Sequence, residues 1–237
     1  MPQNQKIAWA VVISAGIAIA GMATGLGFYK GRAYDRYVTV KGLAEREVKA
    51  DLAIWPITFR VGDNDLGSLQ SGIEKSRRII TEFLLGNGFA MEQISYSAPV
   101  INDTRTQVRY GQDVQSEFRY IAQSTVTTRT GDVDLVRKTM EKSGELVGKG
   151  VVLGEQSWQN PTEFLFTSLN DIKPEMIQEA TTSAREAAEK FAKDSGSKVG
   201  KIRNATQGYF SIEDRDRNSP DVKKVRVVTT VQYYLVD

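Results

Sequence analysis

The chain has 237 residues, of which 41% are apolar and 25% are charged, so it is long and apolar enough to bury a sizeable core. It contains no cysteine and no histidine, which excludes disulfides, thiolate metal sites, cysteine nucleophiles and any chemistry that needs an imidazole. The net charge of +2 comes from dispersed charges of both signs, so the composition does not indicate nucleic-acid binding.

The first predicted element is an uncharged apolar segment at residues 7–29, IAWAVVISAGIAIAGMATGLGFY, which has about the length that crosses a bilayer. A cleaved secretory signal and a retained anchor are both compatible with such a segment. Ala18-Ile19-Ala20 has the small-x-small pattern of a cleavage site, but the apolar run continues to Phe28 and is long for a signal. We therefore expect a transmembrane anchor within residues 1–30, followed by a folded region at residues 31–237.

The orientation of this anchor is left open by its flanking charges. Lys6 precedes the segment and Lys30, Arg32 and Arg36 follow it, which slightly favours a cytoplasmic C-terminal region. The rule weakens where a large domain follows the span, so this bias is small.

Two strands are predicted next, from residues that alternate between apolar and polar. The first covers Tyr37 to Val48, and the second continues from Ala53 to Val61 after a short turn. Pro56 has no backbone donor, so the second strand is expected at a sheet edge or at a bulge.

The period then changes to that of a helix. Apolar residues recur at helical spacing from Leu66 to Leu84, with Asn64 or Asp65 as the expected N-cap and Gly86 as the expected left-handed C-cap. A strand around Ile94 to Val100, a polar loop at 102–113 and a long strand at 114–129 follow.

The second half of the chain repeats this order. We predict a helix at 132–143 that ends at Gly144, strands at 151–158 and 162–167, and a helix at 173–194. Strands at 198–210 and 222–236 then complete the chain. The last helix has a mostly alanine stripe, which lets it lie close to a sheet: Ile177, Ala180, Ala184, Ala187, Ala188 and Phe191. Repeated ββα units of this kind predict an α+β fold, with helices packed on largely antiparallel sheets in two intertwined subdomains.

The candidate sites do not meet the requirements of known motifs. The segment EKFAKDSGSKVGKI contains Gly196 and Gly200, but the helix precedes the glycines, whereas a phosphate loop opens a helix. Gly196 is instead predicted to be a C-cap, with Gly200 at the entry to the next strand. The segment from Asp214 begins like a calcium loop but has Ser219 and Val225 where a glycine and a glutamate are required. We interpret Asp63-Asn64-Asp65 as a helix cap, and Glu45 with Glu47 as the wet face of a strand. No catalytic, cofactor-binding or metal-binding residue is therefore assigned.

Two stretches resemble the SIMPL-domain family of bacterial envelope proteins, which has distant signalling-adaptor relatives in animals. The stretch YVTVKGLAEREVKADLAIWPITFRV, residues 37–61, is similar to the family's opening hairpin through Val38, Val40, Gly42 and Ala50-Asp51, where members often have Pro-Asp. The alanine-rich helix and its exit into a strand are similar through Ala180, Ala184, Ala188, Lys190, Ala192, Gly200 and Lys201. The resemblance covers nearly the whole chain after residue 36.

This resemblance implies a periplasmic or cell-surface location, a two-part α+β fold, self-association and loose links to envelope or oxidative stress. It supplies no catalytic residue. Our leading hypothesis is a non-enzymatic protein held in the inner membrane through residues 7–29, with its C-terminal region in the periplasm or outside the cell. We expect a homo-oligomer, in which strands such as Val225–Val236 pair between subunits, and an envelope protein as an additional partner.

Three other hypotheses remain at this stage. The first is a binding module for a small ligand or an envelope polymer, which requires one deep pocket with convergent polar groups. The second is a hydrolase that uses carboxylates alone, which requires a converging acid pair with one strongly shifted pKa. The third is a signalling adaptor that faces the cytoplasm.

Overall fold

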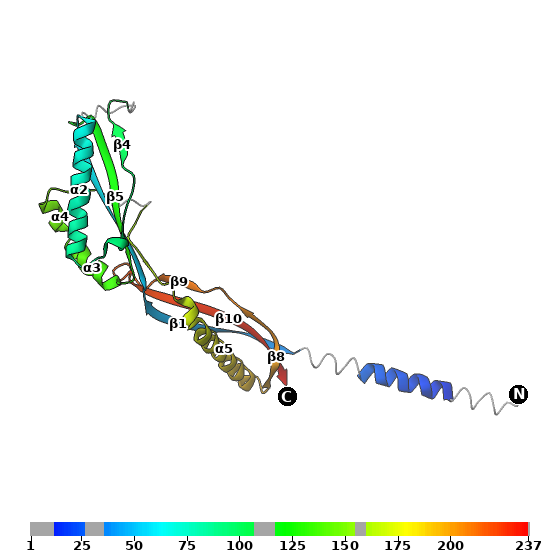
Figure 1. Cartoon of the computed structure of the whole chain (residues 1–237). Helices are drawn as coiled ribbons and strands as arrows, with labels where there is room; N and C mark the ends of the chain where they lie inside the picture. The colour runs from blue at the N-terminus through cyan, green and yellow to red at the C-terminus, as the bar shows by residue number, and fades with distance from the viewer. Residues whose placement is uncertain (1–11, 27–35, 107–116, 155–159, 237) are drawn as a thin grey trace, which may run out of the picture. The chain divides into compact units, whose positions relative to one another are not determined.

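The computed structural model describes residues 12–26, 36–106, 117–154 and 160–236 (Figure 1). The strand pairs that it defines by register are antiparallel, and helices pack on the sheets, so the predicted α+β class is confirmed. The strands are β1 (Tyr37–Lys49), β2 (Leu52–Asp63), β3 (Ile94–Tyr96), β4 (Val100–Asp103), β5 (Tyr120–Thr130), β6 (Val152–Leu153), β7 (Glu163–Leu165), β8 (Lys198–Gln207), β9 (Ser211–Asp214) and β10 (Val222–Val236). After residue 36 the described helices are α2 (Leu66–Gly86), α3 (Val133–Glu141), α4 (Gly144–Gly148) and α5 (Leu169–Asp194), with a 3-10 turn, η1 (Met91–Gln93).

The predicted anchor is described only in part. Residues 12–26 form a helix in which every residue is exposed, and residues 7–11 and 27–29 of the predicted span lie outside the described residues. Among the helices of the described ranges, none is both long and apolar enough to cross a bilayer.

The folded chain forms two compact units, each built from segments that are separate in sequence. The first unit comprises Met1–Arg46, Asn170–Ser211 and Val225–Asp237, and the second comprises Glu47–Leu169 and Ile212–Lys224. The chain therefore passes from one unit to the other four times, within β1, at the start of α5, within β9 and within β10.

The sheet of the first unit has β10 between β1 and β8, and α5 lies along it (Figure 1). Three contacts define β1 and β10 as antiparallel: Leu235 N to Arg36 O at 2.8 Å, Arg226 to Glu45 at 3.4 Å, and Ala50 N to Asp221 O at 2.8 Å. From one contact to the next, the position along β1 advances by as many residues as the position along β10 goes back, so the pairing of the two strands has no register shift. Tyr37 therefore lies opposite Tyr234.

Helix α5 packs on this sheet through alanine, as predicted, but the buried stripe differs from the predicted one. The helix begins at Leu169, four residues before the predicted start, and Pro174 lies in its first two turns. The prediction was wrong for Ala187 and Phe191, which are exposed, and Ile177 is only half-buried. The buried residues follow a strict i+4 row instead: Met176, Ala180, Ala184, Ala188 and Ala192.

The second unit has the larger core. Strand β2 pairs with β5 from Ala53 to Asp63, and α2 packs against both strands (Figure 1). The buried side chains of α2 lie at helical spacing, as the sequence predicted: Leu69, Ile73, Ser76, Ile80, Phe83 and Leu84. Full burial of a Leu, Ile or Phe side chain stabilises a fold by roughly 1.5–3 kcal/mol, so this face of α2 is a main source of the unit's stability.

The expectation that β2 lies at an edge or has a bulge at Pro56 was wrong, because its register with β5 is continuous through Pro56. It is an interior strand, with β5 on one side and with β6 and β7 on the other. β7 pairs with residues 52–54 and β6 pairs with residues 59–60, so Pro56 lies opposite the gap between these two short strands. A proline is tolerated inside this sheet because no strand needs its missing donor on that side.

The helix caps correct two glycine predictions. Asp65 is the N-cap of α2, as predicted, and its side chain accepts a hydrogen bond from Ser68 N at 2.9 Å. Gly86 is not the left-handed residue, because the positive φ of 102° falls at Gly88. Gly144 does not end the second helix but begins α4, and the left-handed residue that follows is Gly150.

Three strand predictions also change. The strand around Ile94 to Val100 is divided into β3 and β4, with residues 97–99 between them. The strand predicted at 114–129 begins at Tyr120, and residues 114–116 lie outside the described residues. Of the strand at 151–158, the described part contains only β6, since residues 155–159 are not described.

Candidate functional site

Strand β8 is a free edge of the sheet in the first unit. Among the described strands it pairs only with β10, so its other edge has no strand partner. None of its ten residues is buried. An edge strand of this length presents unpaired N–H and C=O groups, which are a template for pairing with another strand.

One face of β8 continues the buried face of β10. Ile202 lies opposite Tyr233 and Ala205 lies opposite Val231, and directly opposite residues share a face of a sheet. Tyr233 and Val231 pack with Ala184 and Ala188 of α5 and are 2% and 1% exposed, whereas Ile202 is 52% exposed. The apolar face thus extends beyond the helix that covers it.

Arg203 fastens β8 to the rest of the sheet. Its guanidinium carbon lies 4.0 Å from the centre of the Tyr37 ring and 5.9 Å from that of Tyr234. Because Tyr37 and Tyr234 are opposite each other, the arginine covers an aromatic pair that bridges β1 and β10. A contact of this kind contributes about 0.5–1 kcal/mol at an exposed site.

The other free edge of this sheet, β1, adjoins an acidic hollow of about 520 Å³. Arg46 of β1 donates to Glu175 at 2.8 Å and lies 3.7 Å from Glu179, both on α5. The hydrogen bond to Glu175 raises the pKa of the Arg46 guanidinium above its ordinary value. Three glutamates and one arginine make the hollow negative overall; its lining is Leu43, Arg46, Glu175, Gln178, Glu179, Thr182, Ser183 and Glu186.

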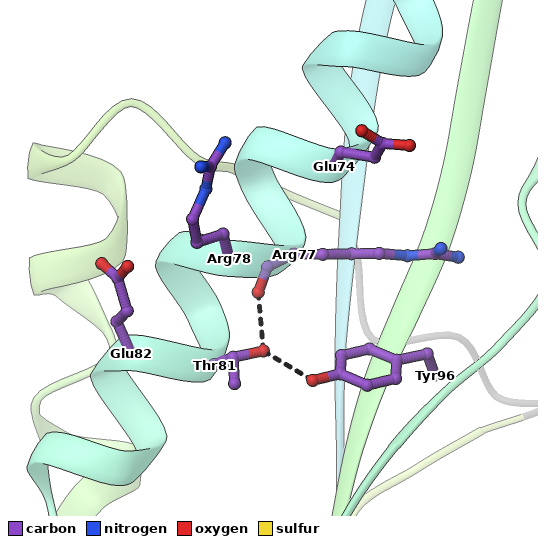
Figure 2. Close-up of a pocket in the computed structure, with 6 residues that line it drawn as sticks. All are labelled: Glu74, Arg77, Arg78, Thr81, Glu82 and Tyr96. Atoms are coloured by element: carbon purple, nitrogen blue, oxygen red, sulfur yellow. Dashed lines mark hydrogen bonds between the residues drawn. The ribbon is translucent and has the colours of Figure 1, made fainter.

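The second unit has a hollow of about 420 Å³ along α2, beside Tyr96 of β3 (Figure 2). Thr81 donates to Arg77 O at 2.8 Å, and the Thr81 and Tyr96 hydroxyls are 3.0 Å apart. Arg77 extends toward β5, away from Arg78 and Glu82, and donates to Ser124 Oγ at 2.9 Å (Figure 2). This arginine is used in packing α2 on the sheet. The hollow carries two arginines and two glutamates, so its charges cancel.

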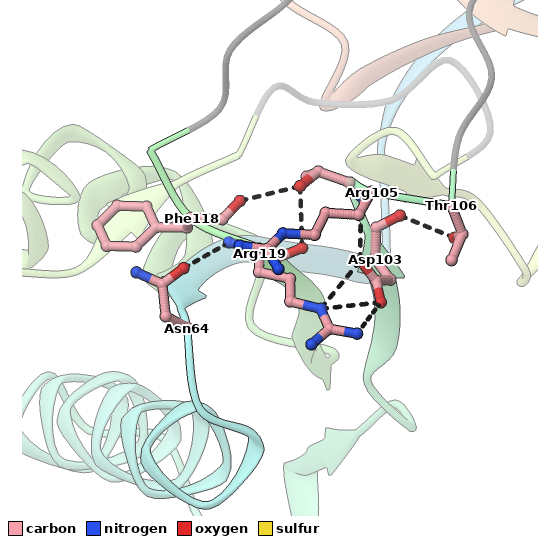
Figure 3. A network of polar contacts seen from close by, with 7 residues as sticks. Asn64, Asp103, Arg105, Thr106, Phe118 and Arg119 are labelled. Atoms are coloured by element: carbon pink, nitrogen blue, oxygen red, sulfur yellow. Dashed lines mark hydrogen bonds and ion pairs between the residues drawn. The ribbon is translucent and has the colours of Figure 1, made fainter.

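An ion pair closes the hairpin of β4 and β5 (Figure 3). Arg119 donates to Asp103 Oδ2 through Nε at 3.2 Å and through Nη2 at 3.1 Å. These bonds hold the pKa of Asp103 below its usual value. The backbone N–H of Arg119 also donates to Asn64 Oδ1 at 2.8 Å, so the side chain that was a candidate helix cap holds this hairpin instead. We interpret this network as structural, because each polar group in it is directed at a neighbouring strand or turn.

The turn between β1 and β2 is fixed by Asp51. Its carboxylate accepts hydrogen bonds from Thr167 N at 2.7 Å, Thr167 Oγ1 at 2.9 Å and Ser168 N at 2.8 Å, just before α5 begins. Partial burial is the largest single influence and raises its pKa, but the bonds from Thr167 and Ser168 together hold the pKa of Asp51 below its usual value. Lys49 pairs with Asp134 and the neighbouring Asp221 pairs with Arg137, so this turn joins four segments of the second unit.

A family model for the SIMPL domain, described as a protein of unknown function (DUF541), matches residues 38–233. The chain belongs to the SIMPL family. No curated protein matches it.

The contacts of Gly42 and Asp51 explain why the residues that resemble the SIMPL family are needed in this fold. Gly42 lies against α5: a Cβ at this position would be 1.8 Å from Ala180 O and 2.4 Å from Ala184 N. Glycine in the opening strand and alanine in the helix are therefore two sides of one contact. Asp51 is the acceptor that ties the turn, which accounts for the aspartate of the Ala50-Asp51 pair.

The other predicted sites of this SIMPL chain have structural roles. Gly196 has a φ of 68° and ends α5, as predicted, and Gly200 lies in β8 beside Tyr234 O. Asp214, the first position of the calcium-like loop, pairs with Lys223. Within the described ranges, no group of three or more Asp or Glu residues is suitably placed for a metal ion.

The resolved pKa shifts of the acids within the described residues all have one direction. Every acid for which a pKa shift is resolved there is shifted downward: Asp51, Asp65, Asp103, Asp134 and Asp216. A carboxyl that donates a proton near neutral pH requires the opposite shift. Glu45 and Glu47 lie near Arg226 and Arg215 rather than converging on each other.

The structure also corrects the predicted assembly strand. Residues Val225–Val236 belong to β10, which is central and paired on both sides. Among the described strands of this sheet, β1, β8 and the short β9 each pair only with β10, and β1 and β8 are its two long free edges. Only three of the ten residues of β8 are apolar, whereas β10 is rich in valine. This low apolar content was the sequence feature that could have identified β8 as an edge strand.

Proposed function

We propose that this chain is a non-enzymatic, membrane-anchored envelope protein that works through self-assembly and protein contacts. The observation that carries this proposal is the free edge of β8, whose apolar face extends beyond the helix that covers the rest of it. Natural sheets usually blunt such an edge with charges and bulges, and the first six residues of β8 have both. The uncharged residues Asn204 to Gln207 lack this protection, so we assign the strand partner to this part of the edge.

Two further observations support a role that depends on contact rather than catalysis. The sequence has no imidazole and no thiol, and the resolved pKa shifts of its acids favour the charged form. Such acids make ion pairs and accept hydrogen bonds, but they are poorly suited to proton donation.

The proposed location is the inner membrane, with a single span at residues 7–29 and the folded region in the periplasm or outside the cell. The apolar sequence of this segment supports an anchor.

Light scattering on the full chain in a mild detergent tests the assembly. We expect a protein mass of at least two chains, and the same mass after tenfold dilution if the assembly is tight. Ala205→Lys, which places a charge on the free edge of β8, is expected to lower the mass to one chain. Gln178→Lys, a change to the same residue type on the exposed surface of α5, is the control that keeps the assembled mass. A monomer at every concentration would contradict the proposal.

A second candidate function, a binding module for a small ligand, is favoured by the α2 hollow alone. Its volume lies in the range of about 300–1,000 Å³ that is usual for ligand sites, and it contains Tyr96 and Arg78. However, it is open rather than deep. Binding of a ligand that is lost in Tyr96→Ala, with the assembled mass unchanged, would favour this function over assembly alone.

A further inference from the structure

We infer that two copies of this chain pair through β8, antiparallel and about a two-fold axis at Ala205, to form one continuous sheet. The inference rests on the proposed function and specifies the contact that self-assembly uses. It follows from three features of the first unit: which edges are free, where the charges lie along them, and which apolar side chains remain uncovered.

The charges distinguish the two free edges. If β1 paired with β1 of a second copy, the two acidic hollows beside it would approach each other, each with Glu175, Glu179 and Glu186. Like charges that face each other across strands are destabilising. Strand β8 has no acidic residue, and its basic residues Lys198, Lys201 and Arg203 all lie in its first six positions.

The charges also select the register along β8. Its last four residues, Asn204 to Gln207, are uncharged. An axis at Ala205 places Ala205 against its own copy, Asn204 against Thr206 and Gln207 against Arg203, so no two charged residues of β8 lie directly opposite each other. The same axis separates the two Lys198 residues by about 46 Å, at about 3.3 Å for each of 14 steps along the strands. An axis near Lys201 would instead bring the lysines of both copies together, at a cost in repulsion.

The apolar face gives this register a gain in burial. Ala205 and Ile202 lie on the side of the sheet that α5 covers, opposite the buried Val231 and Tyr233. A two-fold axis perpendicular to the sheet puts both α5 helices on the same side. The exposed Ile202 and Ala205 of the two copies then form one apolar strip between these helices. Because the contact uses the same patch on both copies, it closes as a dimer and does not extend into a fibre.

The absence of native cysteine permits a direct test by single-cysteine cross-linking of the full chain in detergent. At the axis, Ala205→Cys residues of two copies come within the Cα distance of about 4.4–6.8 Å that a disulfide requires. We expect nearly complete disulfide dimer for Ala205→Cys on mild oxidation. Lys198→Cys, on the same exposed strand, is the matched control and is expected to stay monomeric on reducing-agent-free gels.

Each other outcome overturns a defined part of the inference. An assembled mass in solution with cross-linking at Leu43→Cys of β1, but not at Ala205→Cys, would place the contact at the other edge. Cross-linking only when the Leu43→Cys and Ala205→Cys proteins are mixed would indicate head-to-tail pairing of β1 with β8. Both results refute the inference and leave the proposed function standing. A monomeric mass with no cross-link refutes both. Circular dichroism of each variant confirms that it is folded.

Discussion

Asp51 is the single side chain whose contacts account best for a motif in the sequence. Its carboxylate lies at the turn between β1 and β2 and accepts three hydrogen bonds from Thr167 and Ser168, more than a hundred residues away in the chain. The sequence indicated a turn here, because Lys49-Ala50-Asp51 interrupts two alternating stretches. It could not indicate the partners, since nothing local specifies which distant N–H groups reach a turn.

We expect Asp51→Asn to lower the free energy of unfolding by about 1–2 kcal/mol at pH 7, because the amide is a weaker acceptor than the carboxylate for these donors. The folded-state pKa of Asp51 lies below its usual value, so its contribution is complete above the ordinary carboxyl pKa of about 3.9 and is lost as the pH falls through the folded value. Denaturant unfolding at pH 7 and at pH 3 measures both effects.

The difference between the wild type and Asp51→Asn should therefore shrink at pH 3. Asp194→Asn, an exposed acid at the end of α5, is the control and should change stability little at either pH. A difference that is as large at pH 3 as at pH 7 would show that the carboxylate charge is not what stabilises the turn.

Helix ends show how far local sequence reasoning reaches. Asp65 and Gly196 were predicted correctly because capping depends on side chains within a few residues of the helix end. Gly86 was wrong because α2 continues to Gly86 and the chain turns left-handed only at Gly88. Asn87 extends the pattern by donating from its side chain to Phe83 O at 2.8 Å. With two glycines this close, the sequence alone does not select the one with positive φ.

At the level of whole elements, the contact between β1 and α5 sets how closely a helix lies on a sheet. The alanine-rich stripe predicted a close approach, and the structure adds that Gly42 is the strand residue that permits it. The i+4 row of buried alanines was only partly predicted. Phe191 was assigned to the stripe because it is apolar, but it is 52% exposed.

Gly42→Ala is expected to destabilise the first unit by about 3 kcal/mol or more, because its Cβ would overlap the backbone of α5 and the helix would have to move as a whole. Thermal unfolding by circular dichroism measures the change. Gly86→Ala is the matched control: the added methyl meets nothing within 4 Å, and alanine is favoured over glycine in a helix. Gly86→Ala should leave stability unchanged or raise it. If Gly42→Ala is as stable as the wild type, the close contact is not required.

The sequence analysis did not correctly predict which strand of the candidate site has a free edge. Val225–Val236 was chosen as the assembly strand because it is rich in Val and Thr, but these residues suit a strand with neighbours on both sides, and β10 is central. Strand β8 carries few apolar residues because little of it is covered. The prediction from Pro56 was wrong for a similar reason. The proline is tolerated in an interior strand because of the gap between β6 and β7, and this gap is a tertiary feature that the local sequence does not show.

For the whole molecule, the order of strands and helices was enough to predict the α+β class, and the family match over residues 38–233 agrees with it. How the chain is divided was not readable in detail, because each unit combines segments that are far apart in sequence. What the molecule does depends further on where it is placed in the cell, and in the proposed function residues 7–29 determine this.

The proposed anchor and its orientation can be tested on the full chain. We expect the full chain to remain in the membrane fraction after alkaline carbonate extraction, because a span of this length loses its apolar contacts on leaving the bilayer. A chain that lacks residues 1–30 should be released.

A reporter enzyme that is active only outside the cytoplasm, fused after Asp237, should be active in the full-length fusion and inactive when residues 1–30 are deleted. A fusion that is membrane-bound but inactive, while a cytoplasmic reporter at the same position is active, would reverse the orientation and favour the cytoplasmic adaptor. Release of the full chain by carbonate would remove the anchor itself, and self-assembly through β8 would then have to operate without the membrane bringing copies together.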